Sequence, residues 1–307
     1  MKKVLKWIGI VLGSLIVLIL LVVLGLYTKS RLEFGAKYNL NVETVNIPTD
    51  AASIERGKHL TTILCMECHG DNLDGKKDWF SAGPLGSADT PNLTSGQGGI
   101  GGQFSDADFV RVLRHGVKPN GTSVFIMPAE DFYYLSDRDL GDVIAYVKSV
   151  PPVDGGNGAY SNVHFSFPGN VMYGAGIFGN DLVASKIDQT TQRVTAPEPA
   201  VSTAYGNYLV NINGCRDCHG TQLAGGKPGD PNSPLAPNLT PGGELSAWTQ
   251  ANFLQALHTG VTPLGMQLPA QFMPWDYKGQ MSDDELDAIF MYLQSLPKLP
   301  TSTAPAG

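Results

Sequence analysis

The most informative segment of this chain is Cys65-Met66-Glu67-Cys68-His69-Gly70, in which two cysteines three positions apart are followed directly by histidine and glycine. The same arrangement returns 150 residues later as Cys215-Arg216-Asp217-Cys218-His219-Gly220. These two segments contain all four cysteines of the 307-residue chain. Because every cysteine falls into one pattern, that pattern carries chemical meaning and is not an accident of composition.

The repetition extends on both sides of the cysteine motifs. Each copy has a Gly-x-x-Leu segment before the motif, a Pro-Asn-Leu-Thr segment after it, and later a Met-Pro pair. They stand at 57–60, 91–94 and 127–128 in the first copy, and at 206–209, 237–240 and 273–274 in the second. Such an ordered series indicates a duplicated domain, and its period is too long for a solenoid repeat. We therefore predict one domain at residues 52–152 and another at 200–298.

Helical patterns dominate both copies. Near the end of each copy, a serine that can cap a helix precedes apolar residues at i, i+3, i+4 and i+7, beginning at Ser136 and Ser282. We expect Gly57 and Gly206 to let the last helix cross the first one closely. Strand signals are weak, whereas the chain has 36 glycines and 21 prolines. The expected fold class is mostly α, with two tandem domains and long Gly/Pro-rich loops.

The N-terminal segment predicts a transmembrane helix. From Trp7 to Tyr27 there are 21 residues without a charge, and a helix of that length is roughly 31 Å long, enough to cross a bilayer core. Lys2, Lys3 and Lys6 precede it, so the positive-inside rule predicts a cytoplasmic N-terminus with the rest of the chain outside. A cleaved signal peptide is the alternative, although its apolar core usually has only about 7–15 residues.

The remaining segments connect these parts. We assign residues 1–30 to the anchor, 31–51 to a linker, 153–199 to a connector between the domains, and 299–307 to a tail that we expect to be frayed. Part of the connector should pack across the two domains, because it contains the aromatic residues Tyr160, Phe165, Phe167, Tyr173 and Phe178. The formal net charge of −7 argues against a nucleic-acid partner.

The Cys-x-x-Cys-His spacing is typical of covalent attachment of c-type haem. Two cysteines at the end of a short helix can each form a thioether with one haem vinyl group, and the histidine that follows then lies under the iron. We therefore predict two covalently bound haem c groups. The expected residues are Cys65, Cys68 and His69 for the first haem, and Cys215, Cys218 and His219 for the second.

Three other interpretations of the cysteines compete with this one. Two Cys-x-x-Cys pairs can bind zinc, but here each pair is followed by His-Gly and belongs to its own duplicated domain. A redox disulfide of the thioredoxin type needs a β-α-β context that the sequence lacks. Structural disulfides suit an extracytoplasmic compartment, yet they leave the histidine after each pair without a role.

Methionine is the expected sixth iron ligand in both domains. Met127 is the only methionine after the motif in the first copy, and Met273 matches it in the second, because each stands nine residues before the serine that caps the last helix. Met266 is the rival candidate. Met281 adjoins the last helix and Met291 lies within it, where packing is the expected role. With methionine bound, both irons would be six-coordinate, and their reduction potentials would exceed those of bis-histidine haems.

The other histidines are assigned structural roles. His115 and His258 do not align with each other in the two copies, so bis-histidine ligation is the less favoured alternative. A ligating histidine usually donates its second N–H to a carbonyl or carboxylate. We expect the loops that contain Pro91 and Pro237 to supply that acceptor.

The ordered set of motifs resembles class I cytochrome c domains: Gly-x-x-Leu, Cys-x-x-Cys-His-Gly, Pro-Asn-Leu-Thr, Met-Pro, and a terminal helix with an aromatic residue, here Tyr146 and Tyr292. The resemblance covers about 200 of the 307 residues. The whole pattern is similar to membrane-anchored cytochrome c subunits of bacterial alcohol and gluconate dehydrogenases. Those subunits typically have three haems and a C-terminal anchor, whereas this chain shows two haem motifs and an N-terminal anchor.

The resemblance implies a dihaem electron-transfer protein without catalytic residues. It would relay single electrons between a membrane-associated donor, either a dehydrogenase or a quinol-oxidising complex, and an acceptor such as a terminal oxidase. Its haem domains would lie on the periplasmic side of a bacterial cytoplasmic membrane. One alternative is an enzyme, either a dihaem peroxidase-like protein, which needs one iron open to peroxide, or another haem oxidoreductase. The other alternative is a dedicated subunit of a larger respiratory complex.

Overall fold

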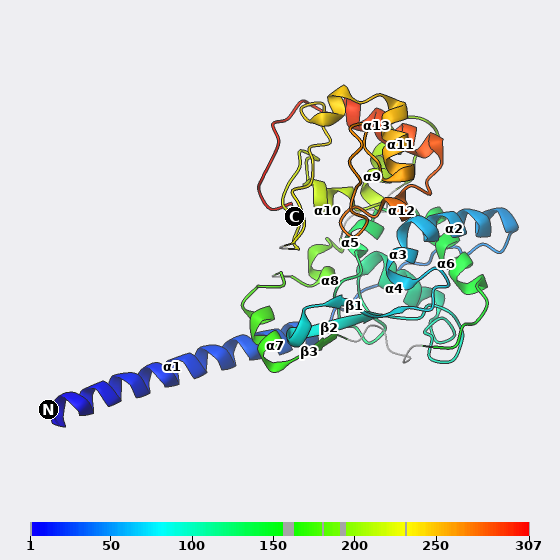
Figure 1. Ribbon diagram of the computed structural model, residues 1–307. Helices are drawn as coiled ribbons and strands as arrows, with labels where there is room; N and C mark the ends of the chain where they lie inside the picture. Colours follow the sequence, from blue (N-terminus) through cyan, green and yellow to red (C-terminus); the bar gives the residue numbers. More distant parts are fainter. Residues whose placement is uncertain (1, 156–162, 180, 191–194, 231, 307) are drawn as a thin grey trace.

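A computed structural model describes residues 2–155, 163–179, 181–190, 195–230 and 232–306. These residues are mostly helical, as the sequence predicts, and Figure 1 shows one long helix that projects from two adjacent domains. The helices of the first domain are α2 (Ala51–Leu64), α3 (Met66–His69), η1 (Gly83–Leu85), α4 (Asp106–His115), α5 (Ala129–Phe132) and α6 (Asp137–Ser149). Those of the second are α9 (Thr203–Ile212), α10 (Cys215–His219), η2 (Glu244–Ala247), α11 (Gln250–Thr259), α12 (Trp275–Lys278) and α13 (Asp283–Ser295).

Each domain is built on a pair of crossed helices, α2 with α6 in the first domain and α9 with α13 in the second. A methyl group added at Gly57 would overlap the carbonyl oxygen of Asp142, and one added at Gly206 would overlap the carbonyl oxygen of Ala288. The two backbones therefore touch at both crossings, which confirms the role predicted for these glycines.

The helix starts also follow the sequence. The Ser136 hydroxyl accepts a hydrogen bond from the backbone N–H of Asp139 at the start of α6. At the start of α13, Ser282 and Glu285 form a complete capping box. These caps satisfy backbone N–H groups that have no partner within the helix.

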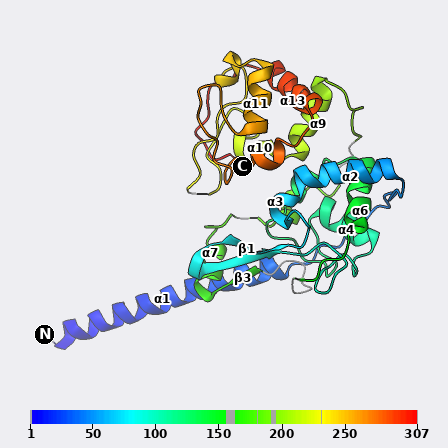
Figure 2. The same cartoon turned by 45° about the vertical axis from the view of Figure 1, so that its right-hand side comes forward.

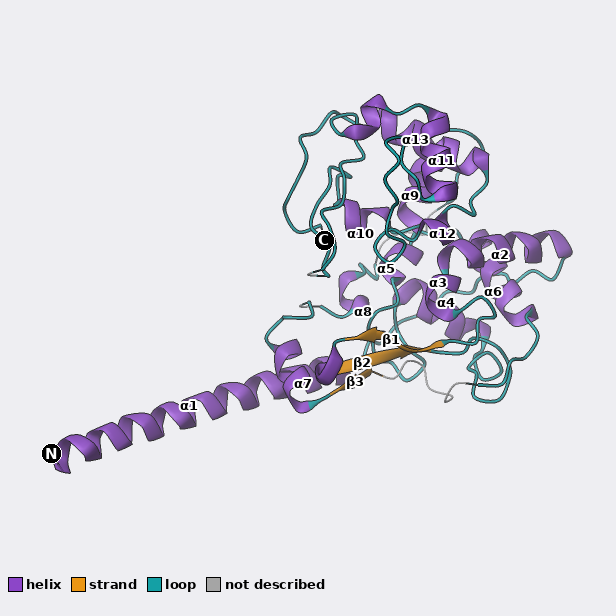
Figure 3. Ribbon diagram, viewed as in Figure 1, coloured by secondary structure: helices purple, strands orange, loops and turns teal. Residues whose placement is uncertain are grey.

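A small antiparallel sheet was not predicted. It consists of β1 (Lys76–Ser81), β2 (Gly86–Thr90) and β3 (Val163–Phe165), in that spatial order, and Figure 3 shows it between the first domain and the long helix. Strand signals in the sequence are weak here, because β1 begins with three charged residues and β2 begins with glycine, and all of these are poor strand formers. The pairing is held instead by the β1–β2 hairpin and by a strand from the connector.

The long helix α1 (Lys2–Gly35) extends five residues beyond the predicted anchor boundary. Within the described residues it is the one helix that is long and apolar enough to cross a membrane, and none of its most apolar part is buried. Its last turns contact the connector, where α7 (Phe167–Gly174) lies alongside it. The short α8 (Val183–Lys186) follows and packs against α5.

Part of the connector packs across the two domains as expected, since Ala196 near its C-terminal end packs against the core that both domains share. Its aromatic residues gather instead against α1 and the first domain, around Phe34 and Phe125. The Phe165 ring lies 5.9 Å from that of Phe34, and the Tyr173 ring lies 4.6 Å from it. Tyr160 lies outside the described residues. The described aromatic residues therefore cover the base of the first domain, and the interdomain packing comes from the end of the connector.

The linker after α1 is fixed to the first domain. The backbone N–H of Tyr38 donates to the carbonyl oxygen of Gly121 at 2.9 Å. The Glu43 carboxylate accepts hydrogen bonds from Arg114 at 2.6 Å and from His115 at 2.8 Å. Burial alone would raise the pKa of Glu43, but these hydrogen bonds outweigh it and lower the pKa to about 2.

The C-terminal segment is not frayed, contrary to the sequence prediction. The backbone N–H of Lys227 donates to the carbonyl oxygen of Ala304 at 2.8 Å, and that of Ala306 donates to Lys227 at 3.0 Å. Ala306 is buried. The C-terminal segment therefore lies along the loop that follows α10 and covers one side of the second domain. The sequence did not predict this, because the segment consists of small residues without apolar periodicity.

The two domains meet through reciprocal contacts. His59 of α2 hydrogen-bonds Glu285 of α13 at 2.8 Å. At the matching positions of the other copy, the Tyr208 hydroxyl of α9 donates to Asp139 of α6 at 2.5 Å. Figure 2 shows α2 and α6 facing the second domain. The interface thus has the self-complementary character of a two-fold dimer, although it lies within one chain.

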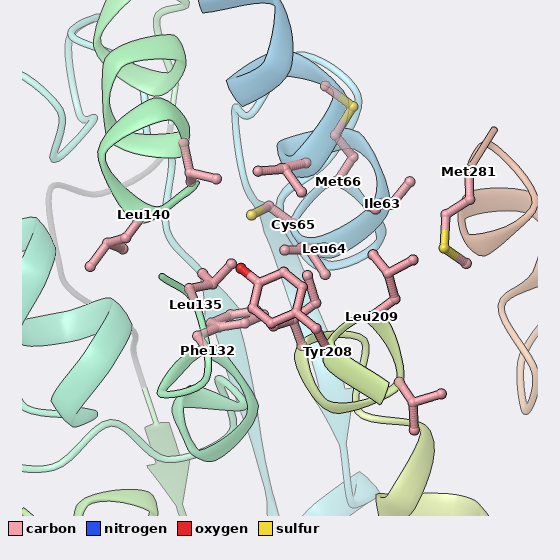
Figure 4. Packing of buried hydrophobic residues seen from close by; sticks show 14 of the residues in the cluster. Ile63, Leu64, Cys65, Met66, Phe132, Leu135, Leu140, Tyr208, Leu209 and Met281 are labelled. Atoms are coloured by element: carbon pink, nitrogen blue, oxygen red, sulfur yellow. The ribbon is translucent and has the colours of Figure 1, made fainter. Parts of the chain in front are cut away.

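A single hydrophobic core runs through both domains. Buried residues of α2 and of the first cysteine motif belong to the same cluster as those of α9 and α13. Figure 4 shows Leu64 and Cys65 close to Tyr208 and Leu209 of the other domain. The boundary between the domains is therefore apolar at its centre and hydrogen-bonded at its edge.

Candidate haem-binding sites

Each cysteine motif forms one short helix directly after the first long helix of its domain. The chain leaves each histidine through a glycine with positive φ, 82° at Gly70 and 77° at Gly220, a conformation that disfavours any side chain. Three residues later, Leu73 and Leu223 also have positive φ, 57° and 58°. Leucine adopts this conformation only when its surroundings enforce it. Both are fully buried, so the same strained turn closes both sites, a feature that sequence reasoning missed.

The two motif histidines are held in the same way. The Nδ1 of His69 lies 2.9 Å from the carbonyl oxygen of Pro91, and the Nδ1 of His219 lies 2.8 Å from that of Pro237. A carbonyl oxygen only accepts, so Nδ1 must carry the proton and Nε2 is left as the basic nitrogen. Burial lowers the pKa of both imidazoles, which favours the neutral, ligating form. The predicted acceptor loops are confirmed.

The Pro-Asn-Leu-Thr segments support these carbonyls. The Asn92 amide donates to the carbonyl oxygen of Val153 at 2.8 Å, and the Asn238 amide donates to that of Leu299 at 2.8 Å. In both copies this amide ties the proline loop to the chain just beyond the last helix. The repeated motif carried this signal in the sequence, but the role of its asparagine emerges only from the fold.

The four cysteines are free thiols beside these histidines. Burial raises the pKa of Cys65 and of Cys68 to about 12 and that of Cys215 to about 11. No group of three or more His, Cys, Asp or Glu side chains suited to a metal ion occurs in the described ranges. Zinc usually takes four such donors, so the two thiols of each motif fit thioether attachment of haem better than a zinc site.

The Met-Pro segments have matching backbones. Pro128 and Pro274 cap α5 and α12 with nearly equal angles, φ −78° and ψ 63° in the first, φ −75° and ψ 60° in the second. Met127 and Met273 are both partly buried against the common core. This similarity supports pairing the two methionines, and their ligation of iron stays a prediction.

The rival methionines lie elsewhere. Met266 is 59% exposed on a surface loop, which suits a buried ligand poorly. Met281 is buried in the core. Met291 is 42% exposed on α13, so its expected packing role was wrong.

The two remaining candidate histidines have both ring nitrogens occupied. His115 contacts Gln189 at 2.7 Å and Glu43 at 2.8 Å. His258 contacts the carbonyl oxygen of Gly279 at 2.6 Å and the Asp283 carboxylate at 2.9 Å. Neither ring has a free nitrogen for iron, so the structural roles predicted for them are confirmed.

The short helix after each Met-Pro pair contacts the other domain's cysteine motif region. Lys278 of α12 donates to the carbonyl oxygen of Ile63 at 2.7 Å, and it interacts electrostatically with Cys65 and with Cys215. On the opposite side, Asp131 of α5 meets Asp217 of α10. Burial and the neighbouring Asp217 raise the pKa of Asp131, so one proton is held between the two carboxyl groups.

Comparison with known proteins points in the same direction. The Cytochrome c family model matches residues 54–151 and 203–297. The cytochrome c subunit of alcohol dehydrogenase (quinone) from Gluconobacter oxydans is 29% identical over 280 residues, covering 82% of this chain and 56% of that subunit. The fructose dehydrogenase cytochrome subunit of Gluconobacter japonicus is 27% identical over 278 residues, covering 81% and 54%. The chain thus spans a little over half the length of these relatives.

Proposed function

Because this chain belongs to the cytochrome c family and carries haem c covalently in both matched domains, we propose that it relays single electrons and performs no catalysis of its own. The observation that carries this proposal is the duplicated site. Each copy has two free thiols, and a histidine whose Nδ1 is fixed on a proline carbonyl. Two such sites in one chain would let an electron taken up at one site pass to the other before it leaves the protein.

In this proposal the residues divide the work in the same way in both domains. Cys65 and Cys68 in the first domain, and Cys215 and Cys218 in the second, would hold the haem through thioethers. His69 and His219 would supply one axial nitrogen, and Met127 and Met273 the axial sulfur. When bound, haem c takes up and releases one electron at a time. The protein's own contribution is burial, fixed histidine orientation and exclusion of water.

Passage of electrons between the two sites is supported by their common surroundings. The cysteine motifs border one continuous core, and Lys278 contacts the first motif region from the second domain. We therefore propose that electrons pass directly between the domains, inside the protein.

The membrane and the redox partners complete the proposal. Helix α1 would cross the bacterial cytoplasmic membrane with its N-terminus in the cytoplasm and hold the haem domains on the periplasmic side. Packing of its last turns on α7 supports an anchor that stays attached to the domains. The names of the relatives support a dehydrogenase as electron donor. A quinol-oxidising complex is the alternative donor, and the proposed acceptor is a protein such as a terminal oxidase.

The test is the absorption spectrum of the dithionite-reduced protein with and without carbon monoxide. Two six-coordinate irons should give no change when the gas is added. The Met127→Ala variant serves as the control, since an opened iron should then give a change that corresponds to one of two haems. A change in the unaltered protein would overturn the relay proposal and favour the peroxidase-like alternative, which a peroxide turnover assay would then measure.

A further inference from the structure

The connector segment 165–179, here called the foot segment, has an unusual composition. Its fifteen residues contain no Asp, Glu, Lys or Arg. Two of its large apolar side chains are exposed, Phe167 at 58% and Ile177 at 62%. Soluble surface segments normally carry charges at such positions, so the exposed face of the foot segment is suited to something other than water.

The foot segment is packed tightly on the end of α1. A methyl group added at Gly174 would overlap the carbonyl oxygen of Leu26, so the two helices touch through their backbones. The buried Ser30 hydroxyl donates to the Asn170 side chain at 3.0 Å. These contacts fix the foot segment to α1 and leave it no freedom to turn its apolar face elsewhere.

The position along α1 at which the foot segment packs indicates what covers its exposed apolar face. The uncharged run of α1 begins at Trp7 and ends at Thr28, and the next residue is the charged Lys29. The Tyr27 ring stacks on that of Phe167 with centroids 5.2 Å apart, and the Lys29 ammonium donates to the carbonyl oxygen of Gly174 at 3.2 Å. The foot segment therefore lies where a membrane-crossing α1 leaves the hydrocarbon core, the layer in which aromatic residues gather.

The inner side of the foot segment faces protein. Tyr173 is 2% exposed and packs on Phe34, and Asn170 is buried against α1. Polar and aromatic groups turned inward, with Phe167 and Ile177 turned outward, give the segment two different faces, as in helices that lie in the plane of a membrane interface.

We propose that the foot segment lies in the interfacial layer of the lipid bilayer, with Phe167 and Ile177 inserted between lipids. The proposal goes beyond electron relay and rests on α1 crossing a membrane. Two adjacent points of membrane contact, α1 and the foot segment, prevent the first domain from rotating about the axis of α1. The bilayer would then set the direction in which this domain faces.

The test uses the full-length haem-loaded chain in nanodiscs of phosphatidylcholine and phosphatidylglycerol. Single variants Phe167→Cys and Ile177→Cys, with Leu24→Cys in α1 and Leu264→Cys in the second domain, carry a nitroxide label. The readout is collision with oxygen, which enriches in lipid, relative to collision with a water-soluble nickel chelate. Leu24 is the lipid standard. Leu264 is the water standard, because it is apolar and 92% exposed but far along the chain from α1.

We expect the oxygen-to-nickel ratio at both 167 and 177 to be several-fold higher than at 264. An oxygen-to-nickel ratio at 167 or 177 equal to that at 264 overturns the proposal. This result would also be expected if a protein partner, and not lipid, normally covered the exposed face. A water-like ratio at 24 as well would instead overturn the membrane anchor itself. An unchanged spectrum of the reduced haems shows that each variant is folded.

A second measurement avoids substitutions. The unaltered chain in nanodiscs that contain a photoactivatable lipid should be labelled within peptides covering 165–179 and not within those covering 261–267, which carry the exposed Leu264 and Met266. Absence of label from 165–179, with α1 labelled, would contradict the proposal.

Discussion

The two haem domains share one frame but differ in what surrounds it. In the first, the loop at 117–123 is covered by the linker and the connector, where Ala184 donates its backbone N–H to the Ser123 hydroxyl at 2.9 Å. The matching loop of the second, at 261–267, is bare and exposes Leu264 and Met266. In place of that cover, Trp275 lies over Gly260, where Val183 lies over Gly116.

The comparison separates two kinds of constraint. The glycine crossing, the histidine–proline hydrogen bond and the strained leucine occur in both copies, so they belong to holding the haem. The linker, sheet and foot segment occur in one copy, so they belong to the position of that domain next to α1. One side-chain contact illustrates the difference. Asp137 contacts Arg114 in the first domain, and Asp283 contacts His258 at the matching position of the second. Of these two partners, Arg114 also binds the linker's Glu43.

Substitutions at the two glycines of the helix crossings should have the largest effect on stability. Gly57→Ala or Gly206→Ala should each cost about 3 kcal/mol, because the added methyl group meets backbone that cannot move away. Denaturant unfolding of the haem-loaded protein measures this. Gly229→Ala is the control, since nothing lies within 4 Å of its added carbon. Equal stability of Gly206→Ala and Gly229→Ala would show that the crossing is not essential to the frame.

The proposed axial ligands test whether the two sites are equivalent. Met273→Ala should lower the potential of the second haem by on the order of 100 mV, a fraction of the roughly 0.8 V that axial ligands span, and remove its share of the methionine–iron near-infrared band. Met127→Ala should do the same to the first haem. Met266→Ala should do neither, because its side chain is exposed. The opposite result for Met273 and Met266 would reverse the assignment.

Lys278 is a difference between the two copies within the interface. It belongs to the second domain and donates to the carbonyl oxygen of Ile63, next to the first cysteine motif. Its matching residue in the first domain is Phe132. A positive charge disfavours the oxidised haem, so Lys278→Met should lower both potentials by on the order of tens of millivolts, measured by potentiometric titration. Lys298→Met, at an exposed position, is the control. A shift confined to one haem would mean that this lysine does not act on the shared boundary.

Acid should weaken the contact between the linker and the first domain. Glu43 has a pKa lowered from 4.5 to about 2. A carboxyl group of this kind stabilises the fold above pH 4.5 and loses that contribution as the pH falls toward 2. The stability difference between the protein and Glu43→Gln, roughly 1–2 kcal/mol at neutral pH, should therefore shrink over this range in denaturant titrations. Glu244→Gln, at an exposed position of the second domain, is the matched control. A constant difference for Glu43→Gln would argue against the linker clamp.

Features with local signals could be predicted from the sequence. The caps at Ser136 and Ser282, the glycine crossings and the proline loops depend on residues close together or on motifs that occur twice. The β-sheet could not be predicted, because β2 pairs with β3 from the connector, as at Gly86 and Phe165. The C-terminal segment was missed for the same reason, since pairing over long sequence distances carries no periodic pattern. The strained Leu73 was missed because leucine gives no sequence signal for a positive φ.

The clamped linker also determines how the haems meet other molecules. A free linker of fifteen residues would let a tethered domain sweep a radius of roughly 20 Å. Here Tyr38 and Glu43 bind the first domain directly after α1 ends, so the linker cannot extend to let the domain move away from α1. With α1 in a membrane as proposed, the haems would be held at a fixed height above it and would not search for their partners. Encounter rates should then depend on lateral diffusion in the bilayer and on the partner's own reach.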